Sequence, residues 1–308
     1  MRYTLRQLEY FVAAGEAGSI RHASERLSIS QPSISTAISH LELELNVQLF
    51  IRHHAQGLSL TAVGQTLLEE ARKVISQAES LYSVAAEATD QIRGMLSVGA
   101  MVTLAPMIMP SLVHNFLTKH PAAEIRQIAS HHEWLVEELR QAEIDTAITY
   151  DLQLPLGIEF TPLASLPPHV IVSETHHFAE RETVSLGELA AEPMIFLDLP
   201  LSRQYFKDLF QKESLQPNIY ARVADQAVVR TMVANGYGYS LSNVRPCSDL
   251  ALDGRRVVRV KLSGEHRPMV IGMATLQGMR KSRLLESFLE YCQTLISDTS
   301  IPGMSPLE

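Results

Sequence analysis

Several features of secreted, membrane and metal-binding proteins are missing from this 308-residue sequence. Its two cysteines, Cys247 and Cys292, lie far apart without a Cys-x-x-Cys or Cys/His cluster, so neither a disulfide framework nor a zinc site is expected. No apolar run reaches the roughly eighteen residues that a membrane span needs, and the first residues lack the apolar core of a signal peptide. We therefore expect a cytoplasmic protein with no membrane partner, in which Cys247 is more typical of a packed or surface thiol than of a redox sensor.

Catalytic signatures are missing as well. The chain contains no GxSxG elbow, P-loop, HExxH or GxGxxG motif. Adjacent histidine pairs begin at positions 53, 131 and 176, but they resemble a metal site only superficially because neighbouring residues on a helix or strand point apart. We predict no enzyme, no metal and no cofactor, and keep hydrolysis as an alternative because α/β lobes with Ser, His and Asp can host it.

The charge balance is acidic, with a formal net charge of -8. Residues 1–60 are nevertheless neutral, because their five arginines offset their five glutamates, and all of the acidity lies downstream. Phosphate neutralisation by basic side chains supplies most non-specific DNA affinity. A DNA-binding module in this segment would therefore bind weakly as a single copy and depend on dimerisation. Separately from its charge, the chain of 308 residues is long enough for two or three domains.

The amino-terminal segment predicts three short helices. Apolar residues at helical spacing give a first helix that ends near Ala17, and Ser19 caps a second helix over about 20–27. A polar turn separates this helix from a third, which begins at Ser30 with a proline in its first turn. The inward stripe of this third helix is Ile34, Ile38, Leu41 and Leu45.

The opposite face of the third helix carries small hydrogen-bonding side chains and no acid before Glu42. In a helix-turn-helix such a face enters the major groove, where Gln reads adenine and Ser or Thr reads either base type. Strand-like runs at 49–52 and 57–60 then predict a β-wing, whose tip would meet phosphate or the minor groove. The alternative is a protein-interaction module with a solvated helix face. The DNA-binding candidates are Arg21, Ser30, Gln31, Pro32, Ser33, Ser35, Thr36, His40, Arg52, His53 and His54.

The run LRQLEYFVAAGEAGSIRHASERLSISQPSISTAISHLELELNVQLFIRHHAQGLSLTAVG resembles the amino-terminal region of LysR-type transcriptional regulators. Its most specific part is ASERLSISQPSISTAISHLE, followed by LF and Arg52. The resemblance places residues 31–36 on the recognition helix and 52–54 on the wing. Such proteins often carry Arg or Lys at positions 36, 39 and 40, where this chain has Thr36, Ser39 and His40. A binding protein that has lost its DNA function is therefore a further alternative.

A long helix is predicted from Thr61 to Asp90, about 45 Å at about 1.5 Å per residue. Its apolar residues alternate spacings of four and three, which is a heptad seam. The seam either packs on its own domain or pairs two copies of the chain, and its length favours pairing. The resemblance also implies dimers or dimer-of-dimers tetramers, hence an inverted-repeat DNA site. The seam residues are Leu67, Ala71, Val74, Ala78, Leu81, Ala85 and Ala88.

From Gly94 onward, short Val- and Ile-rich runs alternate with helical stretches, which predicts α/β lobes. The resemblance continues to the LysR effector domain, which is similar to two-lobed periplasmic solute-binding proteins. The fold class is therefore α/β overall: a winged helix-turn-helix head over 1–60, a linker helix over 61–89 and an effector domain over 90–308. We expect lobe I at about 90–163 and 267–296, and lobe II at about 164–266. No signal peptide is found, unlike in an exported receptor.

Ligands of α/β lobes bind outside the carboxyl ends of strands, often at helix N-termini that favour anions. This rule predicts a small organic anion as effector, with Arg203 suited to a carboxylate. Each candidate has an alternative interpretation. Ordinary N-caps would explain Thr103, Ser202 and Asp225, and packed rings would explain Tyr150 and Tyr237. The alternative for Arg203 is an ion pair with Asp198 or Asp208. The effector-binding candidates are Val102, Thr103, His132, Tyr150, Ser202, Arg203, Asp225, Gln226 and Tyr237.

Overall fold

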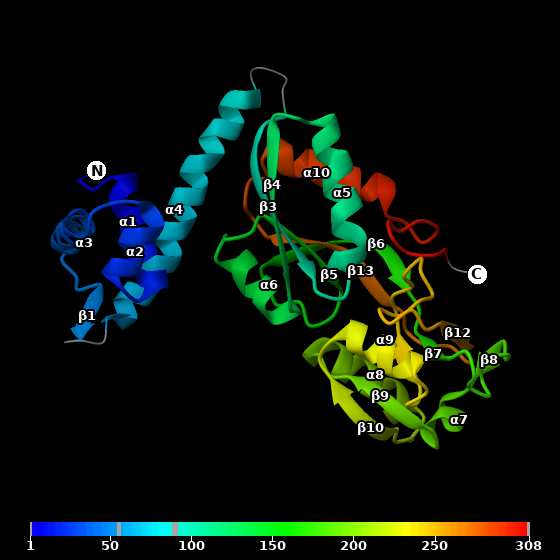
Figure 1. Cartoon of the computed structure of the whole chain (residues 1–308). Helices are drawn as coiled ribbons and strands as arrows, with labels where there is room; N and C mark the ends of the chain where they lie inside the picture. Colours follow the sequence, from blue (N-terminus) through cyan, green and yellow to red (C-terminus); the bar gives the residue numbers. More distant parts are fainter. Residues whose placement is uncertain (1, 54–56, 88–91, 307–308) are drawn as a thin grey trace. The chain divides into compact units, whose positions relative to one another are not determined.

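The computed structural model describes residues 2–53, 57–87 and 92–306 (Figure 1). The chain divides into two compact units, one of Met1–Gly94 with Arg140–Glu143 and the other of Met95–Leu139 with Ile144–Glu308. The predicted wing residue His54 and the last seam residue Ala88 lie outside the described residues, as do the side chains of Arg52, His53 and Ala85.

Three helices open the first unit: α1 (Leu5–Ala17), α2 (Ile20–Leu27) and α3 (Gln31–Leu45). Each begins at a residue whose hydroxyl accepts a backbone hydrogen bond, namely Thr4, Ser19 and Ser30, of which Ser19 and Ser30 are predicted above. Each also ends at a residue in the left-handed conformation: Gly18, Ser28 and Asn46. Because a cap residue begins each helix and a left-handed residue ends it, the connections between the helices are short. Three helices therefore form within the first 45 residues.

The core of the first unit joins these helices to a β-hairpin and a fourth helix. Strands β1 (Phe50–His53) and β2 (Gly57–Leu60) pair antiparallel as the predicted wing. Phe11 of α1 meets Phe50 edge to face at 5.6 Å between ring centroids. Helix α4 (Ala62–Glu87) starts in this core, where Leu68 and Ala71 are buried. A Cβ on Gly64 would lie 2.2 Å from the carbonyl oxygen of Leu49, so only glycine permits this close approach of α4.

The second unit contains two lobes, the first of which is built on a five-stranded sheet. Its order is β4 (Ala123–Ser130), β3 (Gly94–Met101), β5 (Thr146–Tyr150), β13 (Met269–Leu276) and β6 (Ile158–Leu166). The helices of lobe I are α5 (Ala105–Lys119), α6 (His132–Arg140) and α10 (Arg283–Leu295). Phe116 of α5 meets Phe288 of α10 edge to face at 5.1 Å.

Lobe II follows the same α/β plan. One sheet has the order β11 (Ser240–Ser242), β7 (His169–Ser173), β12 (Val257–Leu262) and β8 (Thr183–Val184), and β10 (Asn218–Val223) pairs parallel with β9 (Pro193–Leu197). A bridge between Met194 and Tyr239 links the two sheets. The helices are α7 (Leu186–Ala190), α8 (Pro200–Lys212) and α9 (Gln226–Ala234).

The chain crosses between the lobes twice (Figure 1). The first crossing, at 167–168, joins β6 to β7, and the second, at 263–268, joins β12 to β13. The division predicted after residue 163 therefore falls inside β6.

A tail over 297–306 packs on both lobes. The amide of Ser165 in lobe I donates to Asp298 at 2.6 Å, and the amide of Ser305 donates to the carbonyl of Arg245 in lobe II at 2.8 Å. In the described part of the chain, no helix has the length and apolar character needed to cross a membrane.

Candidate functional site

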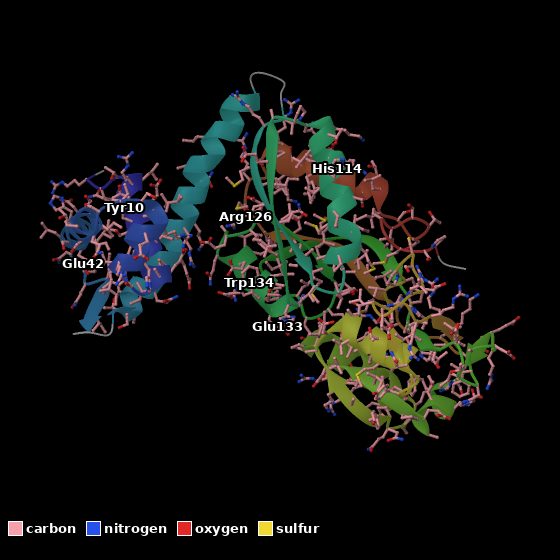
Figure 2. The ribbon with its side chains drawn as sticks, viewed as in Figure 1. Tyr10, Glu42, His114, Arg126, Glu133 and Trp134 are labelled. Atoms are coloured by element: carbon pink, nitrogen blue, oxygen red, sulfur yellow. The ribbon has the colours of Figure 1, made fainter. Side chains whose placement is uncertain are left out.

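Helix α3 presents a polar face on the outside of the first unit. Ile34, Ile38 and Leu41 are buried beneath it. The face itself exposes Gln31, Pro32, Ser33, Thr36, Ser39 and His40, whereas Ser35 is half-buried. The carboxylate of Glu42 (labelled in Figure 2), the first acid of α3, accepts hydrogen bonds from the amides of Leu49 and Phe50, at 2.8 and 3.2 Å. The exposed start of α3 is thus free of carboxylates and rich in donors and acceptors.

Three of the predicted DNA-binding positions are engaged within the chain. The hydroxyls of Ser30 and Ser33 lie 2.8 Å apart, and Ser30 caps α3. Arg21 donates to Glu25 at 3.1 Å, although both side chains are mostly exposed. Such an exposed pair is weak, so Arg21 can exchange its partner for a phosphate. Gln31, Thr36, Ser39 and His40 therefore remain as exposed polar side chains on this face.

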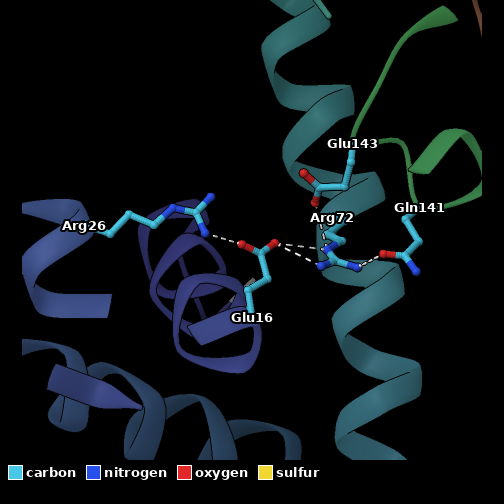
Figure 3. Close-up of polar contacts among 5 residues, drawn as sticks. All are labelled: Glu16, Arg26, Arg72, Gln141 and Glu143. Atoms are coloured by element: carbon cyan, nitrogen blue, oxygen red, sulfur yellow. Dashed lines mark hydrogen bonds and ion pairs between the residues drawn. The ribbon is translucent and has the colours of Figure 1, made fainter. Parts of the chain in front are cut away.

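The carboxylate of Glu16 links α4 to the helices of the head (Figure 3). Glu16 at the end of α1 accepts from Arg26 of α2 at 2.5 Å and from Arg72 of α4 at 3.0 Å. Arg72 also donates to Gln141 and lies 2.8 Å from Glu143. Burial by itself would raise the pKa of Glu16, but the hydrogen bonds from Arg26 and Arg72 lower it below its ordinary value.

The seam along α4 divides into two parts. Leu67 and Ala71 pack on the head's own core, as the alternative of packing within one domain predicts. Further along, Val74 is 43% exposed and Leu81 is 66% exposed. The second part of the seam thus presents apolar side chains that the described residues of this copy do not cover, as the pairing interpretation requires.

One cleft lies between the lobes and holds about 260 Å³ of empty space, part of it open to solvent. Lobe I contributes Thr103, Tyr150 and Met269, and lobe II contributes Leu197, Ser202, Phe206, Gln226, Ser242, Asn243 and Val244. Four of the predicted effector residues therefore meet in one place: Thr103, Tyr150, Ser202 and Gln226. Whether they bind an effector stays a prediction.

The local backbone explains why hydroxyl groups gather there. Thr103 follows strand β3 and Ser202 lies in the first turn of α8, and both are buried. Neither is an N-cap, since the caps of α5 and α8 are Leu104 and Leu199, which provide no side-chain hydrogen bond. The Thr103 hydroxyl instead lies 3.2 Å from that of Tyr150, whose pKa burial raises.

The other predicted effector residues lie outside the cleft lining. Arg203 is exposed and donates to Asp198 at 2.5 Å, the pairing that the sequence left as an alternative. Asp225 is an N-cap that accepts from the amides of Ala227 and Val228. Tyr237 is 51% exposed. Val102 is half-buried beside Thr103.

The histidine pairs behave differently from one another. His132 is buried against Thr149, with Nδ1 2.8 Å from the Thr149 hydroxyl, and burial lowers its pKa. The expectation that adjacent histidines point apart is wrong for His176 and His177, whose rings stack at 4.5 Å because they lie in a turn and not in a helix or strand. In the part of the chain that the structure describes, no three metal-ligating side chains gather.

Sequence reasoning missed six of the cleft residues. Ser242, Asn243 and Val244 stand at the carboxyl end of β11, so the same strand-end rule could have found them. That strand is only three residues long and left no clear signal. Leu197 ends β9, Phe206 lies in α8, and Met269 begins the return strand β13, all as apolar residues without a chemical signature.

Family models match both units. A model described as the LysR substrate binding domain matches residues 89–296, and one described as a bacterial regulatory helix-turn-helix protein of the lysR family matches residues 5–65. The chain belongs to the LysR family of transcriptional regulators. It therefore combines a DNA-binding helix-turn-helix domain with an effector-binding domain.

Individual members of the LysR family agree with this assignment. The crystal structure of HinK, a LysR family transcriptional regulator from Pseudomonas aeruginosa, is 38% identical, covers 95% of this chain and 98% of its own, and has a TM-score of 0.65. The uncharacterized HTH-type transcriptional regulator YybE of Bacillus subtilis is 28% identical over 92% of this chain and 96% of its own. Full-length CbnR complexed with its target DNA is 26% identical, with coverage of 94% and 99% and a TM-score of 0.57.

Proposed function

We propose that this regulator binds an inverted-repeat promoter site as a homodimer, or as a dimer of dimers, with α3 in the major groove. The observation that carries the proposal is the start of α3, where Gln31 and Thr36 are exposed on a face that holds no carboxylate. Gln suits adenine and Thr suits either base type. The sequence assigns Arg52, His53 and His54 to the wing, which would contact phosphate or the minor groove. CbnR bound to its target DNA supports the choice of double-stranded DNA as partner.

Self-association compensates for the neutral charge of the head. Residues 1–60 carry no net charge, and α3 has no Arg or Lys, so one head offers few phosphate contacts. The exposed part of the seam, at Val74 and Leu81, supports pairing through α4. Two heads on one two-fold axis double the phosphate and base contacts and demand a palindromic site.

The effector in this proposal is a small organic anion bound in the cleft. Helices α5 and α8 both begin there without a side-chain cap, so the N–H groups that remain beside the proline in each first turn can bind a negative charge. The hydroxyls of Thr103 and Ser202 stand beside these helix ends. Closure of the lobes around the anion would shift an existing equilibrium between oligomer shapes. The linker helices would pass that shift to the bound heads.

The same cleft supports a receptor over an enzyme. Nucleophilic catalysis by Ser202 would need a base within hydrogen-bond reach. Among the described residues that line the cleft there is no histidine, aspartate or glutamate to serve as that base. We therefore propose a regulator without catalytic activity, acting in the cytoplasm where its promoter DNA lies.

The proposal is tested by selecting DNA from a random library with the full-length protein and measuring a band shift on the selected sequence. We expect an inverted repeat and affinity that falls steeply as salt rises. A scrambled sequence of equal length is the control. Recovery of no common sequence after selection, or equal affinity for selected and scrambled DNA, would refute specific DNA binding.

A further inference from the structure

Asn243 lines the cleft and has one amide atom that lacks a hydrogen-bond partner among the described residues. It follows strand β11, lines the cleft and is 4% exposed. Its Nδ2 donates to the carbonyl oxygen of Leu166 at 2.8 Å and to the hydroxyl oxygen of Tyr205 at 3.3 Å. Among the described residues, its Oδ1 has no hydrogen-bond partner, although it is buried.

The neighbours of Asn243 determine which end of its amide is nitrogen. The Leu166 carbonyl can only accept a hydrogen bond. The Tyr205 hydroxyl gives its own proton to the carbonyl of Arg267 at 2.6 Å, so toward Asn243 it too can only accept. Both protons of Nδ2 are thereby used. If the nitrogen and oxygen of the Asn243 amide were exchanged, its oxygen would face the Leu166 carbonyl and the Tyr205 hydroxyl oxygen, which both act as acceptors. Oδ1 is therefore the atom left without a partner.

A buried acceptor without a donor is costly, and the neutral amide loses this cost when a ligand supplies the donor. The donor has to be small, because the empty space of about 260 Å³ at the cleft includes open solvent. It is a hydroxyl and not an ammonium group, because the described cleft lining holds no carboxylate to balance a buried positive charge. The ligand therefore presents an anionic end to the helices α5 and α8 and a hydroxyl to Asn243.

We propose that the effector is a small hydroxycarboxylic acid, and that Asn243 selects it by accepting a hydrogen bond from its hydroxyl group. The proposal rests on the effector cleft proposed above. Asn243 is also linked by hydrogen bonds, directly or through Tyr205, to residues at both connections between the lobes. Leu166 is the last residue of β6 before the first crossing, and Arg267 lies in the second crossing, reached through Tyr205. Recognition of the hydroxyl thus occurs at the hinge whose movement accompanies effector binding.

The test compares acids that differ by one hydroxyl group, using the full-length protein. The probes are the pairs lactate and propionate, 3-hydroxybutyrate and butyrate, and malate and succinate, measured by thermal shift and then by calorimetry. We expect at least one hydroxy acid to bind about tenfold or more tightly than its parent acid, since a buried polar group left without its partner penalises the analogue that lacks the hydroxyl. Equal affinity within every pair would overturn the proposal, as would the absence of binding by all six acids.

Two variants test whether Asn243 causes the preference for the hydroxy acid over its parent acid. Asn243→Ala removes the acceptor, and the preference for the hydroxy acid should collapse to about twofold or less. Gln226→Ala, another change in the cleft lining, should weaken the binding of both acids of a pair and leave the ratio of their affinities unchanged. A preference retained in Asn243→Ala overturns the role of Asn243. If Asn243→Ala fails to fold, the affinities of the wild-type protein for the paired acids still decide the effector class. A band shift of the wild-type protein on the selected DNA tests DNA binding separately, so the effector proposal can fail while the DNA-binding proposal stands.

Discussion

Glu16 and Arg72 form an ion pair of 3.0 Å that joins the last turn of α1 to α4. Both side chains are largely buried, at 18% and 11% exposed. Glu16→Gln removes the charge from a network that includes Arg26, so the opening free energy of α1 should fall by about 1–2 kcal/mol. Hydrogen exchange of peptides from 5–17 measures this change. Glu25→Gln, which breaks an exposed pair with Arg21, is the matched control and should cost about 0.5 kcal/mol or less.

The same pair makes the head sensitive to acid. The folded pKa of Glu16 is lower than its ordinary value of 4.5, so the ionised group stabilises the fold above that pH. This stability is lost as the pH falls below 4.5 and through the lower folded pKa. The difference in exchange between wild type and Glu16→Gln should therefore be largest near neutral pH and shrink in acid. A difference that grows in acid would contradict the assigned direction.

Base reading by α3 predicts an uneven loss of affinity. Gln31→Ala and Ser35→Ala should each weaken binding to the selected inverted repeat by about five-fold or more, since one base contact contributes about 1–3 kcal/mol. Binding to scrambled DNA should hardly change. Ser35 is half-buried, so its loss should be smaller than that of Gln31. Fluorescence anisotropy with both DNAs measures the ratio, and equal losses on the two would count against base reading.

Pairing through α4 predicts that Leu81→Glu separates the subunits. Leu81 is 66% exposed and lies on the seam, so a dimer would bury one glutamate of each subunit in an apolar contact. The dissociation constant of the dimer should rise at least about tenfold, a cost of about 1.4 kcal/mol. Sedimentation velocity measures it. Gln65→Glu, exposed on the same helix but off the seam, should leave the dimer unchanged; an unaltered dimer in Leu81→Glu excludes this part of the seam from the interface.

Ser202 and Arg203 are neighbours with different expected roles. Ser202 lines the cleft, whereas Arg203 is exposed and paired with Asp198, which also lies 3.6 Å from Arg222. Ser202→Ala should lower the affinity for the best-binding acid about five-fold, which corresponds to the loss of about one hydrogen bond. Arg203→Ala should change it by about twofold or less, which departs from the sequence-based hypothesis that Arg203 holds the carboxylate. Calorimetry on both variants decides, and loss of binding in Arg203→Ala would restore that hypothesis.

The tail depends on a glycine. Gly303 has φ of 72°, and a Cβ there would lie 2.4 Å from the carbonyl oxygen of Met107. Gly278 has a similar φ of 77° but open space around it, so Gly278→Ala controls for backbone strain. Gly303→Ala should destabilise the second unit by about 1–3 kcal/mol more than this control. Denaturant unfolding followed by the fluorescence of Trp134, the single tryptophan, measures the difference (Figure 2). Equal losses would show that the tail can move aside.

Much of the head could be predicted from the sequence because its structure is local. Thr4, Ser19 and Ser30 cap helices through atoms only three residues away, and Gly18 and Asn46 end helices through their own backbone preferences. The apolar stripe of α3 follows from helical periodicity alone. These signals place the predicted boundaries of α1, α2 and α3 where the structure has them.

The cleft was only partly predictable. The strand-end rule finds Thr103, Ser202 and Gln226 because it depends on element order, which alternating patterns reveal. The rule cannot tell which neighbour in a helical turn points inward. It therefore selected Arg203 with Ser202, although Arg203 turns to a carboxylate five residues back.

The sequence by itself determined the family, the helix-turn-helix with its neutral charge, and the plan of two α/β lobes, because caps, periodicity and composition act over a few residues. The tertiary structure alone decided which side chains meet in the cleft and that Asn243 Oδ1 lacks a donor. Its amide is oriented by Leu166 and, through Tyr205, by Arg267. Hydrogen-bond satisfaction depends on atoms that the chain brings together only after both lobes have folded.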